Sequence, residues 1–226
     1  MKQELNTVRP SSAHRWMKCA YSAFAEGLLP RSSSPAAEIG TRTHAVAAQR
    51  LYNALKEAFP DADITAPPAL ETDDPKGDIY EDCVDCYVKS VVEYLAATEE
   101  IVERAGIEER LAENAHGVEI WGTPDCWVYT KTKRLYIFDL KTGEVEVQAH
   151  GNEQLRLYAS IVRASKGLHA MRFELVIIQP RIPNHIKSEC LNYCQLADFT
   201  HLAGMCANAA AFAKADTPRH AGNHCR

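Results

Sequence analysis

Two aspartates and a lysine with a spacing that suits chemistry lie in the middle of the chain. Asp139 and Lys141 are two residues apart, so on a strand both side chains project from the same face. Asp125 opens the preceding predicted strand, and a turn at 131–133 joins the two, so a hairpin can bring Asp125 close to Asp139. Two carboxylates beside one ammonium favour a divalent-metal site that activates water over nucleophilic catalysis by a side chain.

The residues that precede Asp139 give this pattern its weight. Residues 135–138 are a nearly continuous apolar run, which is typical of a strand covered on both faces. At the end of such a strand, a carboxylate and a lysine cost free energy unless they are paired or bind a metal. The alternative to a metal site is therefore a plain ion pair at a sheet edge, formed by Lys141 with Asp139 or Asp125.

Two predicted helices carry further polar side chains. On a helix from about 152 to 165, Gln154 and Tyr158 lie one turn apart on one face. Arg156 and Arg163 share a face of the same helix, where they could meet phosphates or simply form a solvated cationic surface. His44 lies in a helix expected over 36–59, where a lone histidine is more often an ordinary surface or core residue.

Taken in order, these motifs resemble the PD-(D/E)XK nuclease superfamily. Pro124–Asp125, thirteen further residues and Asp139–Leu140–Lys141 match the pattern that names it. Residues 122–125, 139–143 and the pair Gln154 and Tyr158 together resemble its RecB-like branch. Residues 38–44 resemble the first motif of that branch, which supplies a histidine ligand, and residues 10–19 and 108–111 resemble segments of phage and prophage members. The resemblance spans about residues 10–226.

The resemblance implies a role for each matching residue. It makes His44, Asp125, Asp139 and the main-chain carbonyl of Leu140 the metal ligands, with Glu38 as a weaker candidate that supports His44 or a second ion. The implied metal is Mg²⁺, for which Mn²⁺ is a substitute.

The same resemblance assigns the chemical step and the substrate contacts. Asp125, Asp139 and Lys141 are the implied catalytic residues, and Lys141 orients or helps to deprotonate the attacking water and stabilises charge on the phosphate. Gln154 and Tyr158 are the implied substrate-binding residues, and Arg156 is added to them as a candidate contact for phosphates.

The implied function is that of a metal-dependent deoxyribonuclease, with a phage-type exonuclease acting on DNA ends in recombination or genome processing favoured over an endonuclease. DNA is the implied substrate, and a recombinase, a helicase or a single-strand-annealing protein is the implied partner. One alternative is a catalytically silent DNA-binding module, and another is a nuclease subunit active only with a helicase or recombinase partner. Every motif residue is present, which favours the enzyme.

The expected fold is α/β, with a restriction-endonuclease-like core in which helices flank a mixed central β-sheet, and with helical N- and C-terminal extensions. We expect one nuclease domain over 1–226, with an extension at 1–35, the core at 36–180 and a C-terminal extension at 181–226. Helices are predicted at 36–59, 81–105, 152–165 and 196–215. Strands are predicted at 117–122, 125–130, 134–141, 171–179 and 185–194, and a loop or weak strand at 60–80.

Composition places the chain in a broad class. Its 226 residues are 46% hydrophobic, enough for a sizeable core, and the formal charge of −5 argues against a generally basic nucleic-acid coat. No apolar run reaches the about 18 to 20 residues that span a bilayer, and the N-terminus lacks the apolar stretch of a signal peptide. We therefore expect a protein of the bacterial host cytoplasm without a membrane contact.

The eight cysteines favour reduced thiols or a metal centre over disulfides in that compartment. In several RecB-like nucleases, one N-terminal and three C-terminal cysteines bind a [4Fe–4S] cluster, and Cys19 and Cys225 resemble the first two of that set. Because the sequence ends at Arg226, we do not expect a complete cluster in this chain.

Overall fold

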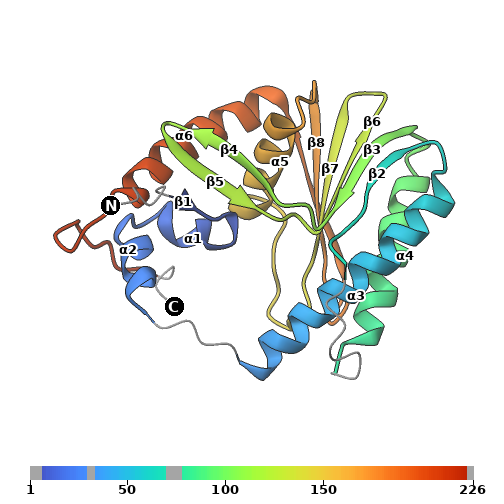
Figure 1. The fold of residues 1–226 in the computed structure, drawn as a ribbon, viewed down its shortest axis with the longest axis horizontal. Helices are drawn as coiled ribbons and strands as arrows, with labels where there is room; N and C mark the ends of the chain where they lie inside the picture. Colours follow the sequence, from blue (N-terminus) through green and yellow to red (C-terminus); the bar gives the residue numbers. More distant parts are fainter. Residues whose placement is uncertain (1–6, 30–33, 70–77, 223–226) are drawn as a thin grey trace.

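The computed structural model describes residues 7–29, 34–69 and 78–222. In this part of the chain, the strands form a larger sheet of order β2-β3-β6-β7-β8-β9 and a smaller sheet of order β1-β5-β4 (Figure 1). The elements are β1 (Thr7–Val8), η1 (Pro10–Ser12), α1 (Ala13–Trp16), α2 (Tyr21–Leu28), α3 (Pro35–Ala58), β2 (Asp63–Thr65), α4 (Glu81–Ala96), β3 (Val102–Ile107), β4 (Leu111–Ala115), β5 (Val118–Gly122), β6 (Cys126–Thr130), β7 (Arg134–Leu140), α5 (Glu153–Ser165), β8 (Arg172–Ile178), β9 (Ile186–Asn192) and α6 (Tyr193–Ala211).

Helices cover both faces of the larger sheet (Figure 1). Leu135 and Ile137 of β7 pack into a core with α5 and α6, whereas Tyr136 and Phe138 pack into a second core with α3 and α4. Successive strand residues point to opposite faces, so the apolar run before Asp139 supplies both cores. The predicted α/β class, with a mixed central sheet, flanking helices and helical terminal segments, is confirmed.

The centre of the larger sheet is a hairpin followed by a crossover. Strands β6 and β7 pair antiparallel, and β7 pairs in parallel with β8 over its whole length. Helix α5 forms the predicted connection between β7 and β8, and it starts where the side chain of Asn152 accepts a hydrogen bond from the backbone N–H of Leu155 at 3.1 Å. This connection brings the first turn of α5 back to the carboxyl end of β7.

The smaller sheet was only partly predicted. Strand β5 was expected, but β4 and β1 were not. Strand β4 pairs antiparallel with β5 through a turn at His116 and Gly117, both with positive φ, and β1 pairs in parallel on the other side of β5. The sheet packs against α5 and α6 through Val8, Val118 and Ile120.

The helix expected over 81–105 is too long, because α4 ends at Ala96. The hydroxyl of Thr98 donates to the carbonyl of Leu95, and Glu99 has a φ of 56°, so the chain leaves the helix there. Strand β3 occupies the last residues of the range, and it lies between β2 and β6 in the sheet. Strand β2 itself confirms the weak strand expected within 60–80.

The two ends of the described chain meet. The thiol of Cys19 is buried and accepts a hydrogen bond from the backbone N–H of His220 at 3.5 Å. The other cysteine of the implied cluster, Cys225, lies outside the described residues.

Candidate metal centre

Asp125 and Asp139 lie side by side at one end of the β6–β7 hairpin. Cys126 pairs with Phe138, so the residues just beyond that pair face each other across the two strands. The backbone N–H of Leu140 donates to Oδ2 of Asp125 at 2.7 Å, which ties the first carboxylate to the strand that carries the second. Local strand pairing alone therefore sets the spacing of the two acids.

Asp139 anchors a chain of polar side chains from α5. Its carboxylate is 2% exposed, with Oδ2 lying 2.8 Å from Nζ of Lys141. Gln154 spans this pair, because its Nε2 donates to Oδ1 of Asp139 at 3.3 Å and its Oε1 accepts from Nζ of Lys141 at 3.1 Å. The same Nε2 lies 3.2 Å from the hydroxyl oxygen of Tyr158. In this structure Gln154 therefore positions Asp139 and Lys141 from one amide group.

Two further residues face Asp125 from outside the hairpin. The Nδ1 atom of His44, on α3, lies 3.2 Å from Oδ1 of Asp125 and 3.8 Å from Oε1 of Glu108. One ligand atom from each of these three residues can be chosen so that all lie within 4.8 Å of one another. The three side chains are 13–28% exposed, so the cluster is open to solvent on one side.

Glu108 was missed as a candidate ligand, although residues 108–111 were part of the family resemblance. It directly follows β3, the strand that sequence reading absorbed into a helix. Its φ of 47° and the bond from its N–H to the carbonyl of Asp125 at 3.2 Å turn it towards the cluster. Residues 102–107, Val-Glu-Arg-Ala-Gly-Ile, show no strict alternation of apolar and polar residues, so no local pattern marked the strand or the acid that follows it.

The electrostatics are those of a crowded acidic site. Burial opposes the charge of His44, but Asp125 and Glu108 outweigh it and raise the imidazole pKa to about 11. Burial raises the pKa of Glu108, reinforced by the charge of Asp125. Burial likewise raises the pKa of Asp139 against the pull of Lys141, whereas for Asp125 the neighbouring His44 overcomes burial and lowers the pKa.

Lys141 remains a cation in this environment. Burial works against its charge, but Asp139 and Asp125 outweigh that effect and raise the pKa of its ammonium. Lys141 and Asp139 do form the ion pair that the sequence left open, but they lie in the middle of the sheet, because β7 is between β6 and β8. A buried ion pair in that position needs compensation from its surroundings, which Gln154 supplies in part.

The donor set fits a divalent cation. Carboxylate oxygens with one imidazole nitrogen are ligands that Mg²⁺ and Mn²⁺ accept. The carboxylates of Glu108, Asp125 and Asp139 outnumber the cations of His44 and Lys141 by one when the imidazole is protonated. A divalent ion in place of the imidazole proton would balance these charges.

Two glycines let helices approach the cluster. A Cβ on Gly122 would lie 2.7 Å from the ring of Tyr158, so only glycine allows this close approach. A Cβ on Gly40 would lie 3.3 Å from Oγ1 of Thr142, just after Lys141. Because Gly40 and His44 are one helical turn apart, the close packing of α3 here also places the histidine.

Two predicted site residues lie elsewhere. Glu38 is exposed in the first turn of α3, six residues before His44, and so points about 120° away around the helix. The guanidinium of Arg156 forms a two-pronged pair with Glu189 at 3.0 and 2.6 Å. The structure therefore assigns Arg156 to the support of β9 rather than to the candidate centre, because two positions after Gln154 it faces another side of α5.

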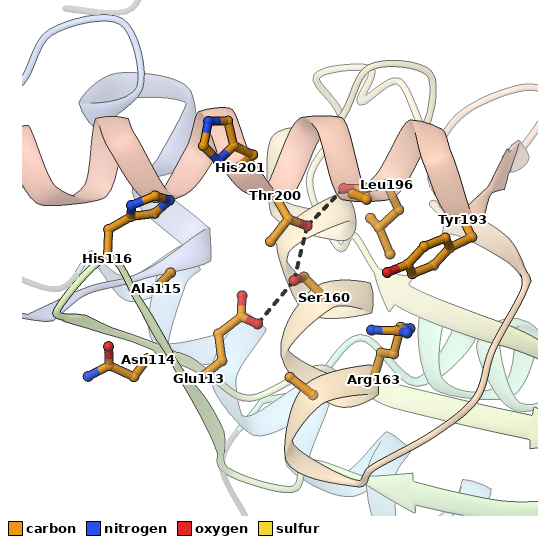
Figure 2. Close-up of a pocket in the computed structure, with 12 residues that line it drawn as sticks. Glu113, Asn114, Ala115, His116, Ser160, Arg163, Tyr193, Leu196, Thr200 and His201 are labelled. Atoms are coloured by element: carbon orange, nitrogen blue, oxygen red, sulfur yellow. Dashed lines mark hydrogen bonds between the residues drawn. The ribbon is translucent and has the colours of Figure 1, made fainter.

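A hollow of about 400 Å³ lies between β4, α5 and α6, and it is separate from the centre (Figure 2). The hydroxyl of Ser160 there donates to Oε2 of Glu113 at 3.1 Å and accepts from Thr200 at 3.1 Å. Ser160 is two residues beyond Tyr158 and therefore points away from the centre. Of the residues that the sequence singled out, Arg163 alone lines this hollow.

Among residues 7–29, 34–69 and 78–222, no helix has both the length and the apolar character needed to cross a bilayer.

Solved structures with a similar chain course include two exonuclease-related proteins. A candidate exonuclease from Eubacterium rectale is 10% identical with a TM-score of 0.48, and the match covers 91% of this chain and 82% of that one. The alkaline exonuclease LHK-Exo from Laribacter hongkongensis is 12% identical with a TM-score of 0.38, covering 92% and 90% of the two chains. At the level of sequence, residues 6–226 match the family described as protein of unknown function DUF2800, and the chain belongs to that family.

Proposed function

We propose that this chain is a metal-dependent deoxyribonuclease of the PD-(D/E)XK type, from its RecB-like branch. The observation that supports this most directly is the convergence of Asp125, Asp139 and Lys141 at one strand end, with His44 and Glu108 beside Asp125. The sequence motif names only the first three residues. The branch resemblance also implied His44, whereas it assigned no role to Glu108, and both side chains face Asp125.

In this proposal the metal ion is bound mainly by carboxylates, and Lys141 contacts the phosphate. His44, Glu108, Asp125, Asp139 and the carbonyl of Leu140 are the candidate ligands. A bound Mg²⁺ or Mn²⁺ would supply Lewis acidity towards a phosphate oxygen and lower the pKa of a water.

Lys141 keeps its proton in this environment, so its role is that of a cation and hydrogen-bond donor to the charge that develops on the phosphate. It is a poor general base for the same reason. Gln154 holds the Lys141 ammonium against Asp139, and Tyr158 holds Gln154 through its hydroxyl oxygen. These contacts limit how far the ammonium can move from the phosphate position.

An exonuclease acting on DNA ends in phage-type recombination or genome processing remains our preferred setting, by analogy with the family. The intact set of motif side chains supports an enzyme over a silent DNA-binding module. A nuclease subunit that needs a helicase or recombinase partner would use the same centre.

The test is digestion of end-labelled linear DNA and covalently closed circular DNA with Mg²⁺, Mn²⁺ or EDTA. Asp139→Ala and Lys141→Ala are compared with Asp198→Ala and Lys131→Ala, which remove an exposed acid and an exposed base elsewhere. Metal-dependent loss of linear DNA alone, abolished only in the first two variants, is the expected result. Cleavage of circles would make the protein an endonuclease. No cleavage by the wild type with either metal would overturn the stand-alone enzyme.

A further inference from the structure

Two arginines stack on one tryptophan beside the candidate metal centre. The guanidinium carbons of Arg9 and Arg110 lie 4.2 and 4.3 Å from the ring centroid of Trp121. The three residues come from adjacent strands or their ends, since Val8 pairs with Ile120 and Ala112 pairs with Trp121. We call these three residues the Arg–Trp–Arg platform.

The platform carries two positive charges without acidic partners. Both arginine side chains are exposed, and within the described part of the chain neither makes an ion pair with a carboxylate. Half of the other arginines in the described residues do form such pairs, as Arg50 and Arg181 show by pairing with Glu81 and Glu144. What distinguishes Arg9 and Arg110 is that both unpaired cations lie over one ring, in a chain with a formal charge of −5.

Stacking prepares a guanidinium for anion binding. A guanidinium over an aromatic ring uses its face for the contact, while its N–H groups point outward in its own plane. Those N–H groups match the geometry of a phosphate, and the ring limits the conformational entropy that the side chain loses on binding. Trp121 thus holds two phosphate-binding groups, one from each side of β5.

Each member of the platform is tied to the metal centre through the backbone. Arg9 precedes Pro10, whose ring lies 3.1 Å from where a Cβ on Gly122 would be, and Trp121 precedes Gly122 itself. Arg110 follows Glu108 by two residues. Asp125 follows Trp121 by four positions, so their Cα atoms are at most about 14 Å apart.

We infer that the Arg–Trp–Arg platform binds phosphodiester groups of the DNA strand that leads into the metal centre. This inference rests on the proposed nuclease function and adds to it the path of the substrate. The strand crosses the face of β5 that is opposite Tyr158, because Trp121 and Gly122 project to opposite sides of the strand. Arg9 and Arg110 then contact phosphates beside the one at the centre, and Trp121 is a positioning residue.

The test measures how DNA binding depends on salt. Anisotropy of labelled single-stranded DNA is recorded in EDTA, so that no cleavage occurs, over a series of salt concentrations. Each phosphate contact contributes about 0.7 to the slope of log K against log salt for a single strand. The variant R9Q/R110Q is expected to lower the slope by about 1.4, and R110Q alone by about 0.7.

A matched pair of arginines controls for charge. Arg219 stacks on Tyr21 at 4.4 Å, and Arg172 begins β8, at the end of the strand away from the centre. R172Q/R219Q removes the same charge and is expected to leave the slope unchanged. An equal fall in both double variants, or an unchanged slope in R9Q/R110Q, would overturn the inference. R9K/R110K keeps both charges and is expected to retain the slope. A lower slope in R9K/R110K would mean that the platform has a structural role.

Cleavage assays separate this inference from the proposed function. If the wild type cleaves DNA, R9Q/R110Q should raise KM and leave kcat within about twofold. The reason is that these phosphate contacts are equally strong in the bound substrate and in the transition state. If the wild type cleaves but the slope does not depend on the platform, the inference fails alone. If the wild type binds DNA with the platform-dependent slope yet does not cleave it with either Mg²⁺ or Mn²⁺, the nuclease proposal fails and the binding surface stands.

Discussion

Gly122 and Tyr158 approach so closely that the position after Trp121 has no room for a side chain. An added Cβ would lie 2.7 Å from Cε1 of the Tyr158 ring and 3.1 Å from the ring of Pro10. Since Tyr158 holds Gln154 and Gln154 holds Asp139, this contact connects the backbone of β5 to the candidate centre. A methyl group at Gly122 therefore acts on the site as well as on the fold.

The first prediction is that Gly122→Ala destabilises the protein by about 1 to 3 kcal/mol, as overpacking does, and lowers nuclease activity by displacing Tyr158. Urea unfolding and cleavage of linear DNA measure the two effects. Gly143→Ala is the control, because nothing lies within 4 Å of the position of its Cβ. Equal behaviour of the two variants would show that the contact does not constrain the site.

The second prediction concerns the amide that links Asp139 and Lys141. Gln154→Ala should lower kcat by about 10- to 100-fold, the usual effect of losing a group that orients metal-site residues, with a smaller change in KM. Steady-state kinetics on linear DNA measure both constants. Tyr158→Phe removes only the hydroxyl that contacts Gln154, so it should lose less activity. If Gln154→Ala instead raises KM by a larger factor than it lowers kcat, the amide acts in substrate binding.

How much of this arrangement could be predicted follows from how local each contact is. The juxtaposition of Asp125 and Asp139 depends on one hairpin whose register is set by a short turn, so residue spacing was sufficient. The place of His44 depends on how α3 packs across the strand ends, which no local pattern specifies. Its position came from the family resemblance, and the structure brings it to Asp125.

The missed elements are those with weak local preference. Residues 111–115, Leu-Ala-Glu-Asn-Ala, contain three residue types that are depleted in strands, and β1 is two residues long. Both are strands because β5 lies between them, which is a tertiary effect. Residues 102–105 were read as the tail of a helix, and Glu108, which follows that strand, was overlooked with them.

The third prediction separates the two candidate glutamates. Mg²⁺ or Mn²⁺ should raise the thermal stability of the wild type, because an ion that binds only the folded state adds about 2.7 kcal/mol at a concentration one hundred times its Kd. Glu108→Gln should reduce this metal-dependent gain, whereas Glu38→Gln should leave it unchanged. Melting curves over a metal titration, with EDTA as reference, give the answer. A reduced gain in Glu38→Gln alone would return Glu38 to the ligand set.

The fourth prediction concerns Arg156 and its partner. Glu189 is buried beside Arg156, and burial raises the pKa of its carboxyl group. The hydrogen bonds from Arg156 and from the backbone N–H of Gly151 outweigh burial, so the pKa lies below its usual value. Glu189→Gln should therefore cost about 2 kcal/mol of folding free energy at pH 7. A depressed folded-state pKa contributes stability above the unfolded pKa of about 4.3, and that stability is lost as the pH falls through the folded value.

Urea unfolding of wild type and Glu189→Gln at pH 7 and below pH 4 tests this dependence. The difference between the two proteins should shrink at the lower pH. Arg156→Gln should show a similar loss of stability with an unchanged salt dependence of DNA binding. A fall in that salt dependence would restore Arg156 as a phosphate contact.

The fifth prediction has the opposite sign and concerns the hollow behind α5 (Figure 2). Burial raises the pKa of Glu113, although the hydroxyl of Ser160 and the charge of Arg163 oppose the shift. A raised folded-state pKa contributes stability below the unfolded pKa and loses it as the pH rises through the folded value. The ionised carboxylate of Glu113 is thus unfavourable to folding at neutral pH.

Glu113→Gln should consequently stabilise the protein at pH 7 and have little effect near pH 4, because its amide oxygen can still accept the hydrogen bond from Ser160. Thermal or urea unfolding at both pH values measures the difference, with Glu189→Gln as the control of opposite sign. If Glu113→Gln instead lowers the stability at pH 7, the ionised carboxylate of Glu113 is stabilised by a neighbouring cation. Arg163 is the candidate for that cation, and Arg163→Gln should then cause a similar loss of stability.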